Sequence, residues 1–570
     1  MRTNAIGRIR IITVVVFCTA LALIARLYHV QVVHGSEYRE HAERQYVHTV
    51  EDFFNRGSIF FTTRHGEEVS AATVKTGFLL AVNPSIVGDN REAVYDALAR
   101  IVPIDKETFL KRTEDIRDSY YEAATHLTRE QSAAIEALDL KGVSLYRDQW
   151  RQYPGGALAA HTVGFVAYDG DELVGRYGLE RYYNDMLLRQ DDKLSVNFFA
   201  EIFSNIGQAI FPADKSRAGD LVTSVEPTVA RTLEGELKGI HEAWESKLTG
   251  GIIINPRTGD IYALGVYPSF DLNDRADAGI EQFKNPLVES VYEMGSIIKP
   301  LTMAAGLDAG VITPSSTYYD AGYLDLDGYT IKNFDGKGRG TVPMQEILSQ
   351  SLNTGVAHIA ALLGGKRFGD YFKKLGLGTE TGIDLPNETH GLISNLESPR
   401  MVEYATASFG QGIAMTPIET ARALGTLANG GVLVTPHVGR KIVYTDGEEQ
   451  AISFPDDDRV YSEKATEEVT RMLVEVVDTA LRGGAYKMEH YSVAAKTGTA
   501  QIANPAGGGY YDDRFLHSFF GYFPAYDPKF FVFLYTVEPG HVRYASETLT
   551  EPFMNIAKFL INYYDIPPDR

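Results

Sequence analysis

Ser296 and Lys299 are the two side chains whose types and spacing could carry out nucleophilic chemistry. They stand three residues apart in GSIIKP (295–300), so on a helix both side chains lie on one face. Pro300 is tolerated only near a helix start, which places Ser296 beside an N-terminus that favours a developing oxyanion. A desolvated lysine, or one beside another cation, has a pKa low enough to act as the base that a serine needs. The pair predicts serine acyl transfer without a cofactor.

Two further short motifs follow in an order that suits the same chemistry. SLN (351–353) supplies a second hydroxyl and an amide, and KTGT (496–499) follows a β-prone run. The two threonine hydroxyls and the lysine ammonium of KTGT suit a carboxylate. A glycine on a strand permits the close approach of another backbone, here that of a peptide substrate.

Each of these motifs is weak when it stands alone. A capping serine or a surface lysine is the commoner explanation of one short match. The chain itself contains a second KTG at 75–77 and a second SxN at 195–197. Both precede the SxxK segment and lack a partner in the right order, so we interpret them as chance matches. The ordered set of three is therefore what favours an enzyme.

The elements that must position these motifs can be read from the pattern between about 216 and 570. A strand (221–225) leads through Pro227 into a helix (230–245), and two strands (250–255 and 261–267) flank a turn. Two more β-rich runs (518–523 and 529–538) and a final helical segment (551–564) close the chain. Strands at both ends with helices between them predict an α/β or α+β domain. Residues 34–215 carry few catalytic side chains and predict a separate, non-catalytic domain.

The N-terminus has the pattern of an export signal. Arg2, Arg8 and Arg10 precede the apolar run Ile11–Ala25, which predicts a cytoplasmic N-terminus and places the bulk of the chain outside. Residues 11–33 together could span a bilayer if Arg26 extends toward the outer headgroups. A retained anchor is favoured over a cleaved signal peptide, and a buried soluble helix is the third possibility.

Composition excludes several other classes of protein. A net charge of −21 over 570 residues argues against nucleic acid, which requires a concentrated basic surface. The one cysteine, Cys18, lies in the apolar run, so the rest of the chain has neither disulfides nor thiolate metal ligands. The 14 histidines include no HExxH motif. His161 and His517 have apolar or aromatic neighbours and predict packing or a local hydrogen bond. No metal site is expected.

The whole chain resembles the class B penicillin-binding proteins, which are monofunctional peptidoglycan D,D-transpeptidases. The ordered motifs SxxK, SxN and KTG are typical of penicillin-binding proteins and class A β-lactamases. The longer matching segments are RLYHVQVVHGSEY (26–38), NRGSI (55–59), YPGGALAAHTVGFV (153–166), GRYGLERYYND (175–185), INPRTGDIYAL (254–264), ASFGQGIAMTPIE (407–419) and HSFFGYFPA (517–525).

The resemblance implies a fold and a set of domains. The fold is a penicillin-binding-protein/β-lactamase-like domain, a central antiparallel sheet flanked by helices, with an elongated α+β pedestal and one N-terminal transmembrane helix. The implied domains are a cytoplasmic tail (1–10), the anchor (11–33), a dimerisation-type pedestal (34–215) and the transpeptidase domain (216–570).

The resemblance also implies roles for the first two motifs. Ser296 attacks the penultimate D-alanine carbonyl of a stem peptide and forms an acyl-enzyme, with Lys299 as the base. Ser351 relays protons toward the leaving D-alanine, and Asn353 orients Lys299 and the substrate amide. β-Lactams would acylate the same serine.

The third motif is similar to the family's carboxylate-binding strand. By that resemblance Lys496, Thr497 and Thr499 bind the terminal carboxylate beside Gly498, and the backbone N–H groups of Ser296 and Thr499 form the oxyanion hole. An amine of a neighbouring stem then takes the acyl group. A glycan polymerase of the shape, elongation, division and sporulation family is implied as a partner in the membrane.

The chain departs from the family pattern in two places, and several activities compete. FFTTRHG (60–66) is longer than the usual turn after NRGSI, and ASETLTEPF (545–553) replaces a Gly-rich approach to a Pro-Phe pair. SFGQGIAMTPIE (408–419) and the compact pedestal favour a septal over an elongation-type enzyme. The competing functions are those of a β-lactamase, a D,D-carboxypeptidase, and a non-catalytic β-lactam sensor or scaffold.

Overall fold

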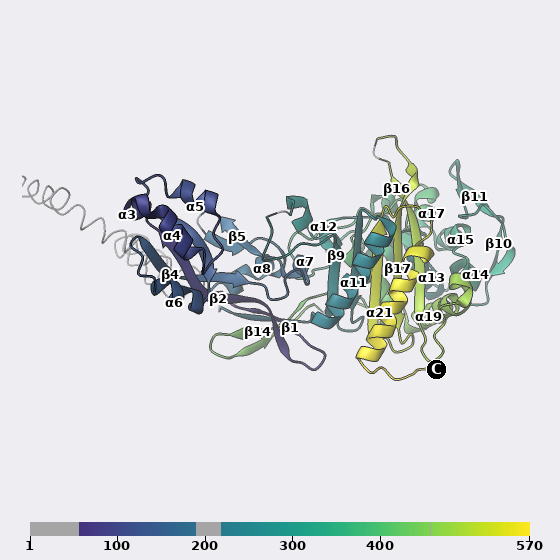
Figure 1. Cartoon of the computed structure of the whole chain (residues 1–570). Coiled ribbons are helices and arrows are strands. Elements are labelled where there is room, and N and C mark those ends of the chain that lie inside the picture. The colour runs from purple at the N-terminus through teal and green to yellow at the C-terminus, as the bar shows by residue number, and fades with distance from the viewer. Residues whose placement is uncertain (1–55, 171, 190–217, 277, 456–457, 505) are drawn as a thin grey trace, which may run out of the picture. The chain divides into compact units, whose positions relative to one another are not determined.

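The computed structural model divides into two units (Figure 1). It describes residues 56–170, 172–189, 218–276, 278–455, 458–504 and 506–570. The predicted anchor, the segment 26–38 and the second SxN match lie outside these ranges. Within them, no helix has the length and apolar character that a membrane crossing needs. The smaller unit includes Val74–Arg151, and the larger one joins Arg56–Thr73 to Gln152–Arg570.

A five-stranded antiparallel sheet with the order β16-β17-β18-β8-β9 forms the centre of the larger unit. Its strands are β8 (Leu248–Ile254), β9 (Ile261–Tyr267), β16 (Ala494–Ala503), β17 (Tyr510–Phe523) and β18 (Phe530–Val537). Isoleucine, phenylalanine and tyrosine are frequent in β8, β9, β17 and β18, and such residues pack well on a pleated surface. The predicted strands at 250–255, 261–267, 518–523 and 529–538 are confirmed. β16, which carries KTGT, is an edge strand of this sheet.

Two long helices cover this sheet. α11 (Pro227–Trp244) and α21 (Thr550–Tyr563) pack against each other and against its strands, and they lie side by side in Figure 1. α11 comes so close to β8 that a Cβ on Gly251 would lie 2.9 Å from Leu233. Both helices were predicted. α13 (Lys299–Asp308) packs against α15 (Asn353–Leu363) and α19 (Glu463–Glu475), and α19 in turn packs on β16.

The remaining elements around the motifs are short. Two antiparallel hairpin-like pairs, β10 with β13 and β11 with β12, lie between α13 and α15 in the chain. They are β10 (Thr317–Asp320), β11 (Tyr323–Leu326), β12 (Tyr329–Lys332) and β13 (Gly340–Pro343). The helices are α12 (Pro286–Glu289), α14 (Met344–Ser349), α16 (Gly365–Lys374), α17 (Met401–Ala407), α18 (Pro417–Ala428) and α20 (Ala545–Thr548).

A second sheet of the larger unit is built from segments far apart in the sequence. β7 (Gly219–Thr223) pairs parallel with β1 (Ile59–Thr62) and antiparallel with β14 (Gly439–Tyr444), which also pairs with β15 (Glu449–Ala451). β1 pairs antiparallel with the first residues of β2 (Glu68–Val82). The strand predicted at 221–225 therefore forms, and it belongs to this second sheet.

Three of the segments that match the family meet around a buried ion pair in the larger unit. Arg56 of NRGSI donates from Nε to Glu180 Oε2 at 2.7 Å and from Nη2 to the Glu180 carbonyl at 2.7 Å. Its Nη1 donates to the side-chain oxygen of Asn184 at 3.0 Å. Glu180 and Asn184 both lie in the segment GRYGLERYYND. Tyr153 of YPGGALAAHTVGFV donates to Glu180 at 3.3 Å. The nearby elements are α7 (Ala160–Val163), β5 (Val166–Asp169), β6 (Glu172–Gly175), α8 (Gly178–Tyr182) and α9 (Asn184–Leu187).

The smaller unit has its own hydrophobic core. The later part of β2 pairs with β3 and β4, and helices pack beside them. The elements are β3 (Tyr121–Leu127), β4 (Val143–Gln152), α3 (Pro84–Val87), α4 (Arg91–Leu98), α5 (Lys106–Arg112) and α6 (Arg129–Glu136). The second KTG (75–77) lies here on β2, where Lys75 stands 5.7 Å from the ring of Trp150. This match does not belong to the unit that holds the ordered motifs.

Candidate active site

The nucleophile turn consists of Gly295–Ile298, one turn of 3-10 helix that leads directly into α13. Residues i and i+3 stand above one another in such a turn, so Ser296 and Lys299 share a face, as the spacing predicts. Ser296 is half-buried. Gly295 has a φ of +66°, and a Cβ there would lie 3.1 Å from the Thr499 carbonyl group. A glycine therefore lets this turn approach the KTGT strand.

Lys299 is the most deeply buried charged group of the site, with none of its surface exposed. Its Nζ donates to the Ser351 carbonyl oxygen at 2.5 Å and to the Ser351 hydroxyl at 3.1 Å. Burial, and then the positive charge of Lys496, hold the pKa of Lys299 well below its usual value. These are the two conditions under which a lysine becomes a base at neutral pH. The structure supplies both of them.

Ser351 connects the two lysines. Lys496 Nζ donates to the Ser351 hydroxyl at 3.2 Å, so this oxygen accepts from both Lys299 and Lys496. Its own hydrogen is then free to point to a third acceptor, because a hydroxyl has one donor and two lone pairs. Ser351 has a φ of +55°, a left-handed conformation that costs roughly 1–2 kcal/mol for a residue other than glycine. The surrounding structure must hold it there.

Lys496 is also buried, and burial lowers its pKa to about 8. A second hydrogen bond goes from its Nζ to the Thr497 carbonyl at 3.0 Å. An ammonium with this pKa is mostly charged at pH 7 and loses its charge as the pH rises through about 8. Both lysines of the site therefore have lowered pKa values, and both donate to one hydroxyl.

KTGT lies on the edge strand β16, where Lys496 pairs with Phe520 and Thr499 with His517 of β17. Thr497 and Thr499 are half-buried, and Thr499 Oγ1 accepts from the Ala545 N–H at 3.1 Å. Because β16 has one neighbour in its sheet, its second edge can take an extended peptide as an added strand. That geometry suits the substrate class that the motif predicts.

The structure gives a second reason for a glycine at position 498, besides the close approach of a substrate backbone that the sequence suggests. A Cβ at this position would lie 2.4 Å from the Ser518 hydroxyl and 2.7 Å from the Met294 carbonyl oxygen. Ser518 itself donates to that carbonyl at 2.8 Å. The missing side chain therefore makes room for the protein's own nucleophile turn, in addition to any substrate backbone.

Asn353 begins α15, and its amide nitrogen donates to the Lys332 carbonyl at 2.9 Å. The hydrogen bonds that orient Lys299 are the ones that its Nζ donates to Ser351. The amide of Asn353 is instead tied to the strand β12, whose last residue is Lys332.

Glu293 is a polar residue of the site that the sequence did not single out. Its Oε1 accepts from the Gly412 N–H and the Tyr510 hydroxyl, both at 3.1 Å, and burial raises its pKa. Gly410 accepts from the Gly295 N–H at 3.1 Å. The segment SFGQG therefore stabilises the nucleophile turn through hydrogen bonds to Gly295 and to the preceding Glu293. The matched segment ASFGQGIAMTPIE was the available signal for this contact.

The histidines and acidic groups show no metal arrangement in the described part of the chain, where no cluster of three or more His, Cys, Asp or Glu could hold an ion. His161 Nε2 lies 2.9 Å from the Gln282 carbonyl, and His517 contacts Thr548 and Arg543 at 3.0 Å each. Burial lowers the pKa of both histidines to about 4. The predicted local hydrogen bonds are confirmed.

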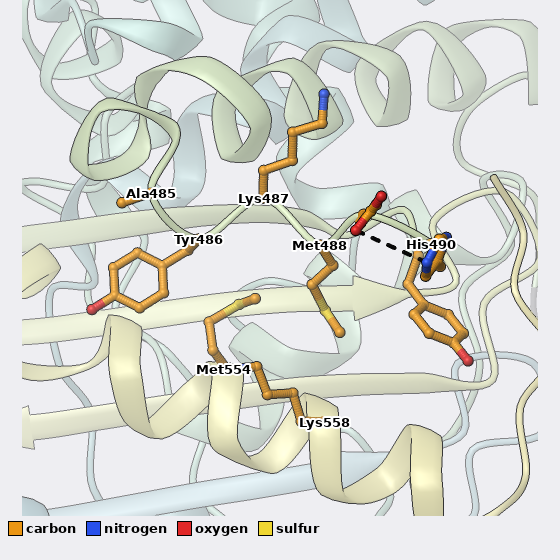
Figure 2. Close-up of a pocket in the computed structure, with 9 residues that line it drawn as sticks. Ala485, Tyr486, Lys487, Met488, His490, Met554 and Lys558 are labelled. Carbon is orange, nitrogen blue, oxygen red and sulfur yellow. Dashed lines mark ion pairs between the residues drawn. The ribbon is translucent and has the colours of Figure 1, made fainter.

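A cavity of about 430 Å³ lies elsewhere in the larger unit (Figure 2). Residues 485–491 form one wall, and Met554 and Lys558 of α21 form the other. None of the three motifs lines it. We therefore do not assign the chemistry to this cavity.

A half-buried serine and a buried lysine share one face of a turn, and a second serine links that lysine to Lys496 on an edge strand. This arrangement is that of a serine acyltransferase. The family described as "Penicillin binding protein transpeptidase domain" matches residues 249–558, and "Penicillin-binding Protein dimerisation domain" matches residues 55–198. The chain belongs to the penicillin-binding protein transpeptidase family, and its two matched domains are those of a class B member.

Similar proteins cover most of the chain. "Stage V sporulation protein D" of Bacillus subtilis is 29% identical over 97% of this chain and 85% of its own length. "Probable peptidoglycan D,D-transpeptidase FtsI" of Caulobacter vibrioides is 30% identical, covering 81% of this chain and 73% of its own. The solved structure of penicillin-binding protein 3 of Mycobacterium tuberculosis complexed with aztreonam has a TM-score of 0.66 at 26% identity, over 75% of this chain and 92% of that one.

Proposed function

We propose that this protein is a peptidoglycan D,D-transpeptidase that works through an acyl-enzyme on Ser296. The observation that carries the proposal is the buried Lys299, which has a lowered pKa and hydrogen bonds to Ser351. An uncharged lysine on the same face as a serine can remove the serine proton. The name of the Caulobacter vibrioides relative and the aztreonam complex of the similar structure support the choice of peptidoglycan and β-lactams as ligands.

Acylation then proceeds with defined proton transfers. Ser296 Oγ bonds to the penultimate D-alanine carbonyl while Lys299 takes its proton. The C–N bond breaks, and the leaving D-alanine amine receives a proton through Ser351, whose hydroxyl lies between the two lysines. Asn353 binds the substrate amide. The backbone N–H groups of Ser296 and Thr499 receive the oxyanion.

The terminal carboxylate of the stem peptide binds to the KTGT strand. Lys496 supplies the charge, and the hydroxyls of Thr497 and Thr499 supply hydrogen bonds beside Gly498. After D-alanine leaves, an amine of a neighbouring stem attacks the ester and returns the proton to Ser296. The product is a cross-link between two stems.

The cellular setting of this reaction follows from the same resemblance. We propose a septal role in cell division, which the FtsI name of one relative supports; sidewall synthesis during elongation is the alternative. A monofunctional transpeptidase needs glycan strands, so a membrane-embedded polymerase is the expected partner. Midcell enrichment of a fluorescent fusion would support the septal role, and a dispersed sidewall pattern would contradict it.

The proposed placement is a single pass through the bacterial cytoplasmic membrane. Residues 1–10 form the cytoplasmic tail, 11–33 the anchor, 34–215 the pedestal and 216–570 the transpeptidase domain. Arg2, Arg8 and Arg10 before the apolar run support a cytoplasmic N-terminus, with catalysis on the outer face.

Labelling with a fluorescent penicillin tests the proposed chemistry. We expect the wild type to be labelled covalently and Ser296→Ala to remain unlabelled. Ser315→Ala changes an exposed serine of the same unit and should label like the wild type. Absence of label on the wild type would refute the enzyme hypothesis. Slow release of the label favours a transpeptidase and rapid turnover a β-lactamase, whereas release of D-alanine without cross-linking indicates a carboxypeptidase.

A further inference from the structure

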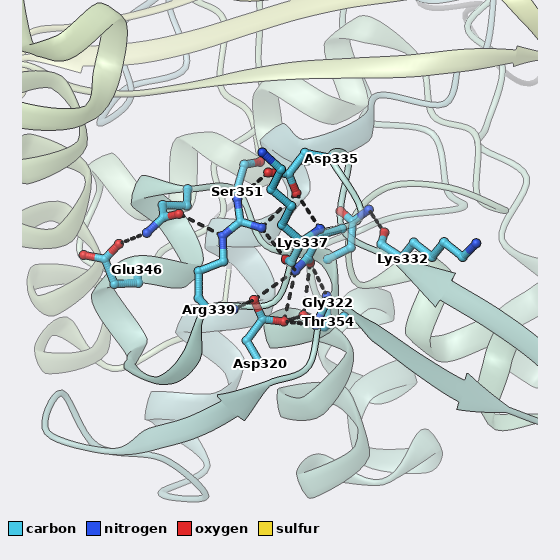
Figure 3. A network of polar contacts seen from close by, with 12 residues as sticks. Asp320, Gly322, Lys332, Asp335, Lys337, Arg339, Glu346, Ser351 and Thr354 are labelled. Atoms are coloured by element: carbon cyan, nitrogen blue, oxygen red, sulfur yellow. Dashed lines mark hydrogen bonds and ion pairs between the residues drawn. The ribbon is translucent and has the colours of Figure 1, made fainter.

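Asp320 is a buried carboxylate behind the SLN motif, with 1% of its surface exposed. It ends β10, and donors from three other segments converge on it (Figure 3). Oδ1 accepts from the Gly322 N–H at 2.9 Å and the Thr354 hydroxyl at 2.8 Å. Asn333 Nδ2 lies 3.0 Å from both carboxylate oxygens, and the Arg339 N–H donates to Oδ2 at 3.1 Å.

Asn333 and Thr354 extend these contacts to the first turn of α15. The side-chain oxygen of Asn333 accepts from the Thr354 N–H at 3.3 Å, and it also lies 3.1 Å from the Thr354 hydroxyl, which shares its one hydrogen between Asn333 and Asp320. Thr354 directly follows Asn353, and Asn333 directly follows Lys332. The buried carboxylate thus ties together the two chain positions next to the Asn353–Lys332 hydrogen bond.

That hydrogen bond decides which way the Asn353 amide points. A backbone carbonyl only accepts, so the amide nitrogen of Asn353 must be the atom that faces Lys332. The amide oxygen then points to the opposite side. If Lys332 moved, nothing in this contact would hold the amide in that orientation.

Arg339 makes a second connection from the same loop to the motif. Its Nε donates to Gln350 Oε1 at 3.0 Å, one residue before Ser351, and its guanidinium pairs with Asp335 at 2.8 Å. Since Ser351 adopts an unfavourable positive φ, this contact helps to hold it. The loop 333–339 therefore supports both ends of the motif.

We propose that Asp320 is a positioning residue for acylation. Through Asn333 and Thr354 it holds the Lys332 carbonyl against the Asn353 amide, so that the Asn353 oxygen is presented to an N–H of the acyl donor. This inference rests on the proposed function, because it needs Asn353 to bind the substrate amide.

The test compares two β-lactams on the full-length protein and its Asp320→Asn variant. Benzylpenicillin carries a side-chain amide N–H, and a carbapenem with a hydroxyethyl side chain carries none. An asparagine at 320 places an amide nitrogen at one of the two oxygen positions, and donors already face both positions, so the cluster is disrupted. We expect the second-order acylation rate by benzylpenicillin to fall about tenfold or more, the scale of a lost hydrogen bond, and the rate with the carbapenem to fall clearly less.

Matched variants separate positioning from folding. Asp325→Asn alters an exposed carboxylate of β11 in the neighbouring hairpin and should leave the ratio of the two rates unchanged. Thr354→Val removes one donor and keeps the buried charge, so it should shift the ratio in the same direction even if Asp320→Asn does not fold. Thr354→Ser keeps the hydroxyl and should have the wild-type ratio of the two acylation rates.

The outcomes are distinguishable from those for the proposed function. An equal fall with both β-lactams, or an unchanged ratio in Thr354→Val, overturns the positioning role while the wild type still reacts. A wild type that neither β-lactam acylates contradicts the proposed function itself. A lower melting temperature with an unchanged ratio assigns Asp320 to stability alone and also overturns the inference.

Discussion

Replacing Lys496 by methionine should move the pH dependence of acylation in a direction that the structure fixes. Lys299 Nζ and Lys496 Nζ donate to the same hydroxyl of Ser351 at 3.1 and 3.2 Å, so the two nitrogens lie within about 6.5 Å of each other. At this separation two unit charges repel by about 2.5 kcal/mol for an effective dielectric constant of about 20. Burial, and then this repulsion from the Lys496 charge, therefore lower the pKa of Lys299.

The sign of the effect follows from the roles of the two groups. Lys299 must be neutral to act as a base, so the rate rises as pH passes its pKa. Lys496 must be charged to bind the carboxylate, so the wild-type rate falls above about pH 8, where burial places its pKa. Lys496→Met removes the falling limb, and because it also removes the repulsion it shifts the rising limb to higher pH. Because the groups are coupled, the limbs report apparent pKa values of the pair.

The assay is the second-order rate of labelling by a fluorescent penicillin between about pH 5 and pH 10. The informative quantity is the pH at which the rate rises. The absolute rate also falls in this variant, because the ammonium that binds the substrate carboxylate is lost. Lys487→Met, at an exposed lysine of the larger unit, is the control and should keep the wild-type profile. A rising limb that stays in place, or moves to lower pH, would refute the electrostatic reasoning.

Three further changes test the scaffold. Arg56→Met leaves Glu180 buried without its ion pair, so the free energy of unfolding measured with urea should fall by about 3–5 kcal/mol; an unchanged midpoint contradicts this. Gly498→Ala places a Cβ against the Met294 carbonyl, so it should lower the free energy of unfolding by about 1–3 kcal/mol and slow penicillin labelling. Wild-type stability and labelling in this variant would contradict the prediction. Hydrogen bonds hold the pKa of Asp260 far below its usual value despite the opposing effect of burial, so its stabilisation is present above about pH 4 and lost as pH falls. In Asp260→Asn the melting temperature should fall less steeply below about pH 4 than in the wild type. An equally steep fall in the variant would show that Asp260 does not cause this pH dependence.

Much of the fold could be predicted because its signals are local. The β-rich runs at 250–255 and 529–538 form β8 and β18, and the segment after Pro227 forms α11. Strand pairing could not be predicted in the same way. β1 pairs with β7 across a sequence distance of well over a hundred residues, and no pattern within either segment specifies that neighbour.

The site divides in a similar manner. The spacing of Ser296 and Lys299 predicts a shared face, and the turn confirms it. The left-handed backbone of Ser351 and the hydrogen bond from Asn353 to Lys332 have no counterpart in the SLN motif itself. Both depend on residues that become neighbours only after folding.

The ordered motifs by themselves determined the chemistry expected of this protein: a serine nucleophile, a lysine base and a strand suited to a carboxylate. Residue type and chain order are enough for that inference. Only the tertiary structure decided that Lys299 has a low pKa, because burial and the charge of Lys496 arise from packing distant segments together. It also decided why position 498 must be glycine, since the atoms that fill the missing Cβ belong to Met294 and Ser518. Proton affinity and steric space are properties of neighbours in space, and the sequence orders only neighbours along the chain.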